Sequence, residues 1–179
     1  MLSLALRRYV EADRDAVLAV FDANVPAYFG ADERWWLVDS LDDLDGPAFV
    51  AVLDDEVVAF GGFEIWDYYD KALLYWGMAH PRVHGRSVGG WLLAERLARI
   101  ARADPPTRWV TVDTSPRVAP FFLSQGFETA GVWPHGYRAG GTMHIMRYDL
   151  AATTPEALDA RAAAAYATAL AKLTRTLPP

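Results

Sequence analysis

The chain has 179 residues, 53% of them hydrophobic, so a single globular domain with a sizeable core is expected rather than a disordered chain. It contains no cysteine, which excludes disulfides, cysteine–zinc sites and thiol catalysis. The net charge of −6 disfavours nucleic-acid binding, and no apolar run is long enough to cross a membrane, so we expect a cytoplasmic protein.

Four strands and two helices are predicted in the first half of the chain from the spacing of apolar residues. The strands are expected at residues 2–9, 48–53, 56–65 and 72–79, and the helices at 14–24 and 32–44. Asp13 is expected to cap the first helix, and Asp54-Asp55 to form the turn of a hairpin. The fourth strand then leads into the most informative stretch of the sequence.

That stretch is His84-Gly85-Arg86-Ser87-Val88-Gly89-Gly90, followed by an amphipathic helix predicted at 89–103. A loop of small residues between a strand and a helix lets backbone N–H groups converge, and the helix start adds partial positive charge. The loop therefore predicts an anion site, with Arg82 and Arg86 available to neutralise a phosphate. It is not a P-loop, which requires Gly-Lys-Ser/Thr, and it follows the fourth strand rather than the first, unlike a dinucleotide fingerprint.

Three more strands, a short helix and a helical tail complete the prediction. The strands are expected at 108–113, 127–133 and 142–150, and the short helix at 118–124. Residues 1–150 are expected to form one domain. The alanine-rich tail 151–179 is predicted to be helical to about residue 175, with Thr153 and Glu156 as a capping box, and to pack on the domain or at a homodimer interface.

These residues resemble the GNAT superfamily of acyl-CoA N-acyltransferases, whose loop reads Gln/Arg-x-x-Gly-x-Gly/Ala and is followed by a Leu-Leu pair. His84 takes the Gln/Arg place and Ser87 that of the first glycine, and the helix carries Leu92-Leu93. His80-Pro81 is similar to the pair that ends the family's fourth strand, and the segment 121–127 to its Tyr-x-x-x-Gly-Phe motif.

The resemblance covers residues 3–150 and implies an α/β (α+β) fold. A mixed, mostly antiparallel sheet of six to seven strands is expected between helices, with splayed fourth and fifth strands. It also implies acetyl-CoA as cosubstrate, with its pyrophosphate on the loop amides and its pantetheine arm along the fourth strand. The implied cofactor-binding residues are Met78, Ala79, His80, His84, Gly85, Arg86, Ser87, Val88, Gly89, Gly90 and Phe122.

Acyl transfer to an amine requires a proton acceptor, because an alkylammonium has an ordinary pKa near ~10.4. Glu64 is the first candidate base, followed by Asp67, His80 and Asp113. Phe122 occupies the place of the family's acidic tyrosine and has no proton to give, while Ser115 occupies the matching asparagine position. Ser115, Tyr137 or a water is then the acid, or the thiolate leaves unassisted. The histidines lack zinc-like spacing, so no metal is expected.

The sequence thus predicts an N-acetyltransferase that moves an acetyl group from acetyl-CoA to a primary amine by direct attack in a ternary complex. A GNAT-like acyl-CoA sensor without turnover and an unrelated phosphate-binding protein are the alternatives. Four aromatic residues are candidates to wall the acceptor pocket: Phe29, Trp35, Trp36 and Trp66. Tyr75 and Trp76 are expected on opposite faces of the fourth strand.

Overall fold

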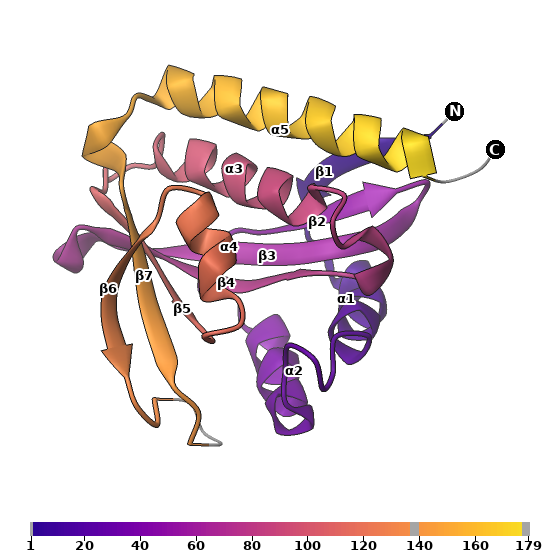
Figure 1. Ribbon diagram of the computed structural model, residues 1–179, viewed down its shortest axis with the longest axis horizontal. Coiled ribbons are helices and arrows are strands. Elements are labelled where there is room, and N and C mark those ends of the chain that lie inside the picture. The colour runs from indigo at the N-terminus through magenta and orange to yellow at the C-terminus, as the bar shows by residue number, and fades with distance from the viewer. Residues whose placement is uncertain (1, 137–139, 177–179) are drawn as a thin grey trace.

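A seven-stranded sheet forms the centre of the computed structural model, which describes residues 2–136 and 140–176. The strand order is β1-β2-β3-β4-β5-β7-β6, and helices cover both faces (Figure 1). Neighbouring strands are antiparallel except β4 and β5, which are parallel. The predicted fold class is confirmed. None of the described helices is both long and apolar enough to span a membrane.

Every predicted element is present, with ends that differ by up to three residues. The strands are β1 (Leu4–Arg8), β2 (Ala48–Leu53), β3 (Glu56–Trp66), β4 (Lys71–Ala79), β5 (Trp109–Thr114), β6 (Glu128–Trp133) and β7 (Met143–Asp149). The helices are α1 (Arg14–Asp22), α2 (Arg34–Asp42), α3 (Val88–Ile100), α4 (Ala119–Ser124) and α5 (Pro155–Thr176).

α3 lies on one face of the sheet, and α5 runs along the outer side of α3 (Figure 1). Leu93 and Leu97 of α3 are fully buried in one core cluster with sheet residues such as Leu74. Leu158 and Leu173 of α5 belong to the same cluster and are each 1% exposed. Burial of one such leucine contributes about 1.5–3 kcal/mol, so α5 is an integral part of this core.

α1 and α2 cover the opposite face of the sheet (Figure 1). Val17 and Phe21 of α1 and Leu37 of α2 are buried in a second cluster with Val50 and Phe60 from β2 and β3. The two helices are joined by residues 23–33, which pass beside the end of β4. The sheet therefore separates two cores.

Two predicted helix caps are wrong. Asp13 occupies the N-cap position of α1, but its carboxylate accepts hydrogen bonds from Arg7, at 2.5 and 2.6 Å, and from the Val10 N–H at 3.0 Å. The ion pair with Arg7 thus replaces the helix cap. At α5, Thr154 rather than Thr153 accepts the Ala157 N–H, at 3.2 Å, because a 3-10 turn precedes the helix and uses the N–H of Thr153.

Candidate functional site

β4 and β5 are paired over only three residue couples and then separate. The ladder runs from Lys71 opposite Trp109 to Leu73 opposite Thr111. Within the described residues, the facing edges of β4 and β5 beyond this point have no strand partner. Their N–H and C=O groups are therefore open to an added strand or to an amide-bearing ligand, except the Ala79 carbonyl, which accepts from the side chains of Asn24 and His84. The splayed fourth and fifth strands were predicted from the family resemblance.

A β-bulge interrupts β4 at this open edge. The pairing with β3 shifts between the couples Phe60–Met78 and Gly62–Tyr75, which leaves one extra residue in β4, and Trp76 has a φ of 46°. Tyr75 and Trp76 both pack against the core cluster beneath α1 and α2. The prediction that they lie on opposite faces is wrong, because a bulge breaks the alternation of a regular strand.

The residues between β4 and α3 are fixed by histidine hydrogen bonds. His80 Nδ1 accepts the N–H of Arg82 at 3.1 Å, and His84 Nε2 donates to the Ala79 carbonyl at 2.8 Å. Burial, then the charges of Arg82 and His84, lower the pKa of His80. His80 Nδ1 cannot take a proton while it holds the Arg82 N–H. This arrangement gives His80 a structural role at the end of β4.

Gly85 and Ser87 adopt left-handed backbone conformations, with φ of 73° and 65°, and turn the chain into α3. The first N–H groups of α3, from Val88 to Gly90, have no acceptor inside the helix. A Cβ at Gly89 would meet no atom within 4 Å, so the backbone there borders open space. The loop thus has the open amides and the helix start that an anion site requires.

Of the two cations that the sequence suggested beside this loop, one is paired with a carboxylate and one remains. Arg82 forms an ion pair with Glu56, with 2.5 Å between Nη1 and Oε2, whereas Arg86 is half-buried at the loop itself. A third cation at the loop belongs to α5. Lys172 Nζ donates to Ser87 Oγ at 2.8 Å. Sequence reasoning missed Lys172, because 85 residues separate it from Ser87 and no motif contains it. Its one signal is that Lys71 and Lys172 are the only lysines in the chain.

Tyr28, from the α1–α2 connection, lies between two segments that border the splayed strands. Its ring contacts His84 edge-on at 5.3 Å between ring centroids, and the Arg117 guanidinium lies 4.9 Å from the centroid. His84 belongs to the loop before α3, and Arg117 to the β5–α4 connection. Tyr28 therefore links the two sides of the opening.

Glu64 and Asp113 lie on the same face of the sheet. Glu64 pairs with Leu73, and Leu73 with Thr111, so these three side chains share one face, and Asp113 follows two residues after Thr111 on β5. Partial desolvation raises the pKa of Asp113, and the charge of Lys71 partly opposes the shift. Burial also raises the pKa of Tyr75, with smaller contributions from nearby carboxylates that include Glu64. Two carboxylates are thus held where the strands begin to separate.

The other predicted acid–base residues have different surroundings. Asp67 Oδ1 accepts the N–H of Tyr68 at 2.7 Å and shapes the β3–β4 turn. Ser115 directly follows β5 and is half-buried. The ring of Phe122 is 7% exposed and packs edge-on against Phe127 in the core, with 5.2 Å between centroids. Tyr137 lies outside the described residues.

One buried charge was not anticipated. Arg96 of α3 is 3% exposed, and no carboxylate lies within ion-pair distance of it in the described part of the chain. Its Nη1 donates to the Gly62 carbonyl at 3.2 Å, and burial lowers its pKa to about 10, so it stays protonated at neutral pH. Gly61 and Gly77 make room for the guanidinium: a Cβ at either would lie 2.8 or 3.0 Å from it.

The four aromatic residues proposed for an acceptor wall do not form one group. Trp35 and Trp36 stack on each other on α2, with 6.2 Å between centroids, and are both exposed. Phe29 packs against Phe21 and Trp76 in the second core cluster. Trp66 is instead the last residue of β3, and the Lys71 Nζ lies 4.5 Å from the centroid of its ring. Only the Trp35–Trp36 pair is therefore largely open to solvent.

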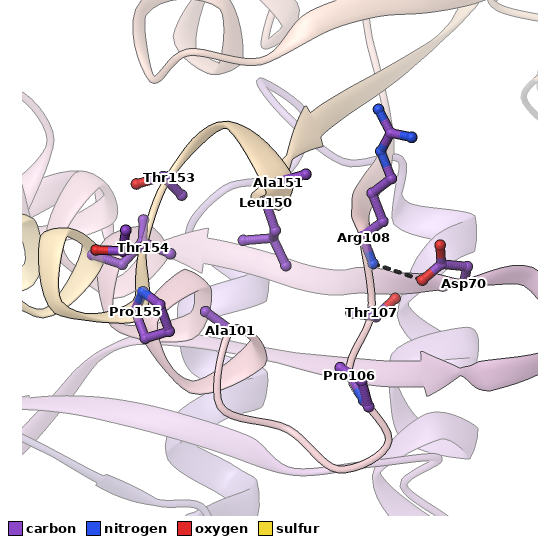
Figure 2. A pocket seen from close by; sticks show the side chains of 11 residues that line it. Asp70, Ala101, Pro106, Thr107, Arg108, Leu150, Ala151, Thr153, Thr154 and Pro155 are labelled. Carbon is purple, nitrogen blue, oxygen red and sulfur yellow. Dashed lines mark hydrogen bonds between the residues drawn. The ribbon is translucent and has the colours of Figure 1, made fainter.

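A hollow of about 350 Å³ lies at the opposite end of β5 from the splay (Figure 2). Asp70, Arg108, Leu150 and Pro155 contribute to its lining, and the Arg108 N–H donates to Asp70 Oδ1 at 2.8 Å. No group of three or more His, Asp or Glu side chains is placed to hold a metal ion within residues 2–136 and 140–176. The strongest site is thus the splay with its loop.

Solved acetyltransferases have this fold. A GNAT-family protein from Desulfovibrio desulfuricans superposes with a TM-score of 0.69 and 22% identity, over 83% of this chain and 99% of that one. The ribosomal-protein-S18-alanine N-acetyltransferase of Escherichia coli superposes with a TM-score of 0.66 and 15% identity, over 82% of this chain and 94% of that one. The Salmonella typhimurium protein yncA, solved with its cofactor acetyl-CoA, superposes with a TM-score of 0.62 and 18% identity, over 83% of this chain and 94% of that one. None of the curated proteins matches the chain.

These likenesses define the class of protein as an N-acetyltransferase fold. The sequence identifies the family: the model of the acetyltransferase (GNAT) family matches residues 13–127. The chain belongs to this family of N-acetyltransferases, which use acetyl-CoA. The family prediction made from the loop and from the segment 121–127 is thereby confirmed.

Proposed function

We propose that this enzyme transfers an acetyl group from acetyl-CoA to a primary amine by direct attack in a ternary complex. The observation that carries the proposal is the separation of β4 and β5 after a three-couple ladder, next to the loop that starts α3. The loop amides from Ser87 to Gly90 bind the diphosphate of coenzyme A, because the Arg86 N–H already donates to the Val83 carbonyl at 3.1 Å. The free edge of β4 as far as the Ala79 N–H pairs with the amides of the pantetheine arm. Beyond it, the Ala79 carbonyl accepts from His84 and Asn24, and the His80 N–H donates to Val58.

The neutral amine attacks the thioester carbonyl carbon, the C–S bond breaks, and the thiolate leaves with the electron pair of that bond. The second proton on the attacking nitrogen is then released to water, from which the thiolate can be protonated. A backbone N–H of β4 stabilises the charge on the carbonyl oxygen. The amine arrives as an ammonium and must lose a proton, for which Glu64 and Asp113 are the remaining candidates. Between these two carboxylates, Asp113 is favoured as the base because its pKa is raised. His80 is not a candidate, because its Nδ1 accepts the Arg82 N–H and holds the backbone of the loop.

No side chain of the usual kind protonates the thiolate, because Phe122 is buried and has no acidic proton. A thiol has an ordinary pKa near ~8.5, so the thiolate can leave without an acid and take its proton from water. Ser115, which follows β5, is the described side chain that could supply one instead. Loss of activity in Ser115→Ala, at unchanged coenzyme A affinity, would assign that step to Ser115.

The test is thiol release from acetyl-CoA over a panel of amines: polyamines, amino acids, peptide N-termini and lysine peptides. The chain has no cysteine, so a thiol reagent reads released coenzyme A without background from the protein. We expect release that depends on both acetyl-CoA and one class of amine. Titration with coenzyme A that yields no heat would contradict the proposal. Binding without release for every amine would favour the acyl-CoA sensor.

A further inference from the structure

Lys172 brings a positive charge from α5 to the start of α3. Its Nζ donates to the hydroxyl of Ser87 at 2.8 Å, and Ser87 is the N-cap residue of α3. The contact joins two segments that are 85 residues apart in the chain. It places an ammonium at the loop whose amides the proposed function assigns to the diphosphate.

The backbone of Lys172 is held in this place by core packing. Ala169 and Leu173, on the neighbouring positions of α5, are 0% and 1% exposed. One turn earlier, the Tyr166 hydroxyl donates to the Leu4 carbonyl at 3.2 Å, and the Tyr166 ring packs against Trp91 of α3. The register of α5 on α3 is thus fixed on both sides of Lys172, so only its side chain must reach the loop.

The loop needs such a cation. A diphosphate brings negative charge to a protein whose own net charge is −6. Of the two cations that the sequence suggested, Arg82 is paired with Glu56, so Arg86 alone is left to share the charge of the diphosphate with Lys172. Helix-start amides carry only partial charge, whereas an ammonium can make a charge-assisted hydrogen bond to a phosphate oxygen.

We propose that Lys172 is a coenzyme A-binding residue that contacts the diphosphate at the start of α3. This inference rests on the proposed function and adds to it a residue outside residues 13–127, the part of the chain that the family model matches. The family loop therefore supplies the amides, and α5 completes the site with the charge. Ser87 orients the ammonium before the ligand arrives.

Calorimetric titration with coenzyme A tests the proposal on four proteins: the wild type, Lys172→Met, Lys172→Arg and Arg102→Met. We expect roughly a tenfold increase in Kd for Lys172→Met, and a much smaller one for Lys172→Arg, which keeps the charge. Arg102→Met is the matched control. It removes one cation just beyond the other end of α3, about 20 Å from the loop, where Arg102 pairs with Asp159 of α5 at 2.6 Å. It thus tests whether a lost α3–α5 contact alone weakens binding, and it should leave Kd within about twofold.

A second ligand, 3′-dephospho-coenzyme A, identifies the phosphate. Lys172→Met should weaken binding of both ligands by the same factor. A loss confined to coenzyme A would assign Lys172 to the 3′-phosphate and overturn the diphosphate contact. If the wild type binds and Lys172→Met binds equally well, with an unchanged thermal midpoint, the inference fails while the proposed function stands. No binding by the wild type overturns both.

Discussion

The Asp113 side chain is exposed, but partial desolvation raises its pKa, which makes it a stronger proton acceptor than an unperturbed aspartate. The base must be deprotonated, so activity should fall as the pH drops through this raised pKa, above the usual ~3.9. We predict that Asp113→Asn lowers kcat by about 10²-fold or more and removes this acid limb. Glu64→Gln, on the same face of the sheet, should keep it. The measurement is the pH profile of kcat/KM from thiol release. An unchanged profile in Asp113→Asn would transfer the role to Glu64.

The Arg7–Asp13 pair makes stability depend on pH. Arg7 and the Val10 N–H lower the pKa of Asp13 below its unfolded value. A group with a lowered folded pKa stabilises the protein above its unfolded pKa, and this contribution is lost as the pH falls through the folded pKa. Asp13→Asn should therefore cost about 1–3 kcal/mol at pH 7 and clearly less at pH 2, in urea titrations at both values. Equal losses at both pH values would contradict this role.

Arg96 packs α3 against two glycines, Gly61 of β3 and Gly77 of β4, at the bulge between these strands. A Cβ at Gly61 would lie 2.8 Å from Arg96 Nη1. We predict that Gly61→Ala costs about 1–3 kcal/mol of unfolding free energy in the wild type and clearly less in an Arg96→Ala background, where the guanidinium is absent. Gly89→Ala is the control, because its Cβ meets open space. Additive losses in the double mutant, measured by urea unfolding, would show that the two residues do not share this space.

The two threonines that precede α5 make different hydrogen bonds. Thr154 Oγ1 accepts the Ala157 N–H, whereas Thr153 contributes its backbone N–H to the preceding turn. Thr154→Ala should then cost about 1 kcal/mol, and Thr153→Ala should change the unfolding free energy by less than about 0.5 kcal/mol. Thermal or urea unfolding of the two variants checks the assignment. The reverse order would restore the cap that the sequence pattern suggested.

The whole molecule should respond to coenzyme A as a ligand that binds only the folded state. At about 100 times its Kd, such a ligand adds about 2.7 kcal/mol to the unfolding free energy, which raises Tm by roughly 5–10 °C for a chain of this size. Differential scanning calorimetry measures the shift. ATP, which lacks the pantetheine arm, should give a smaller one. Equal shifts with both ligands would mean that β4 takes no part in binding.

The order and type of the elements could be predicted from the sequence because the apolar spacing and the loop after β4 are local signals. Side-chain contacts between distant segments could not. Lys172 meets Ser87, and Arg96 occupies the space left by Gly61, only because α5 and α3 pack where they do. The bulge at Trp76 misled the assignment of faces, since the residue itself carries no sign of a positive φ.

The short β4–β5 ladder has a mechanical consequence. Three residue couples are the only strand pairing between the half of the sheet that holds β1–β4 and the half that holds β5–β7, within the described residues. α5 spans both halves: Arg161 donates to the Gln125 carbonyl at 2.9 Å beside α4, and Tyr166 to the Leu4 carbonyl in β1. α5 therefore connects the two halves on the side of α3, and its contacts help to hold the separation between β4 and β5 at a fixed width.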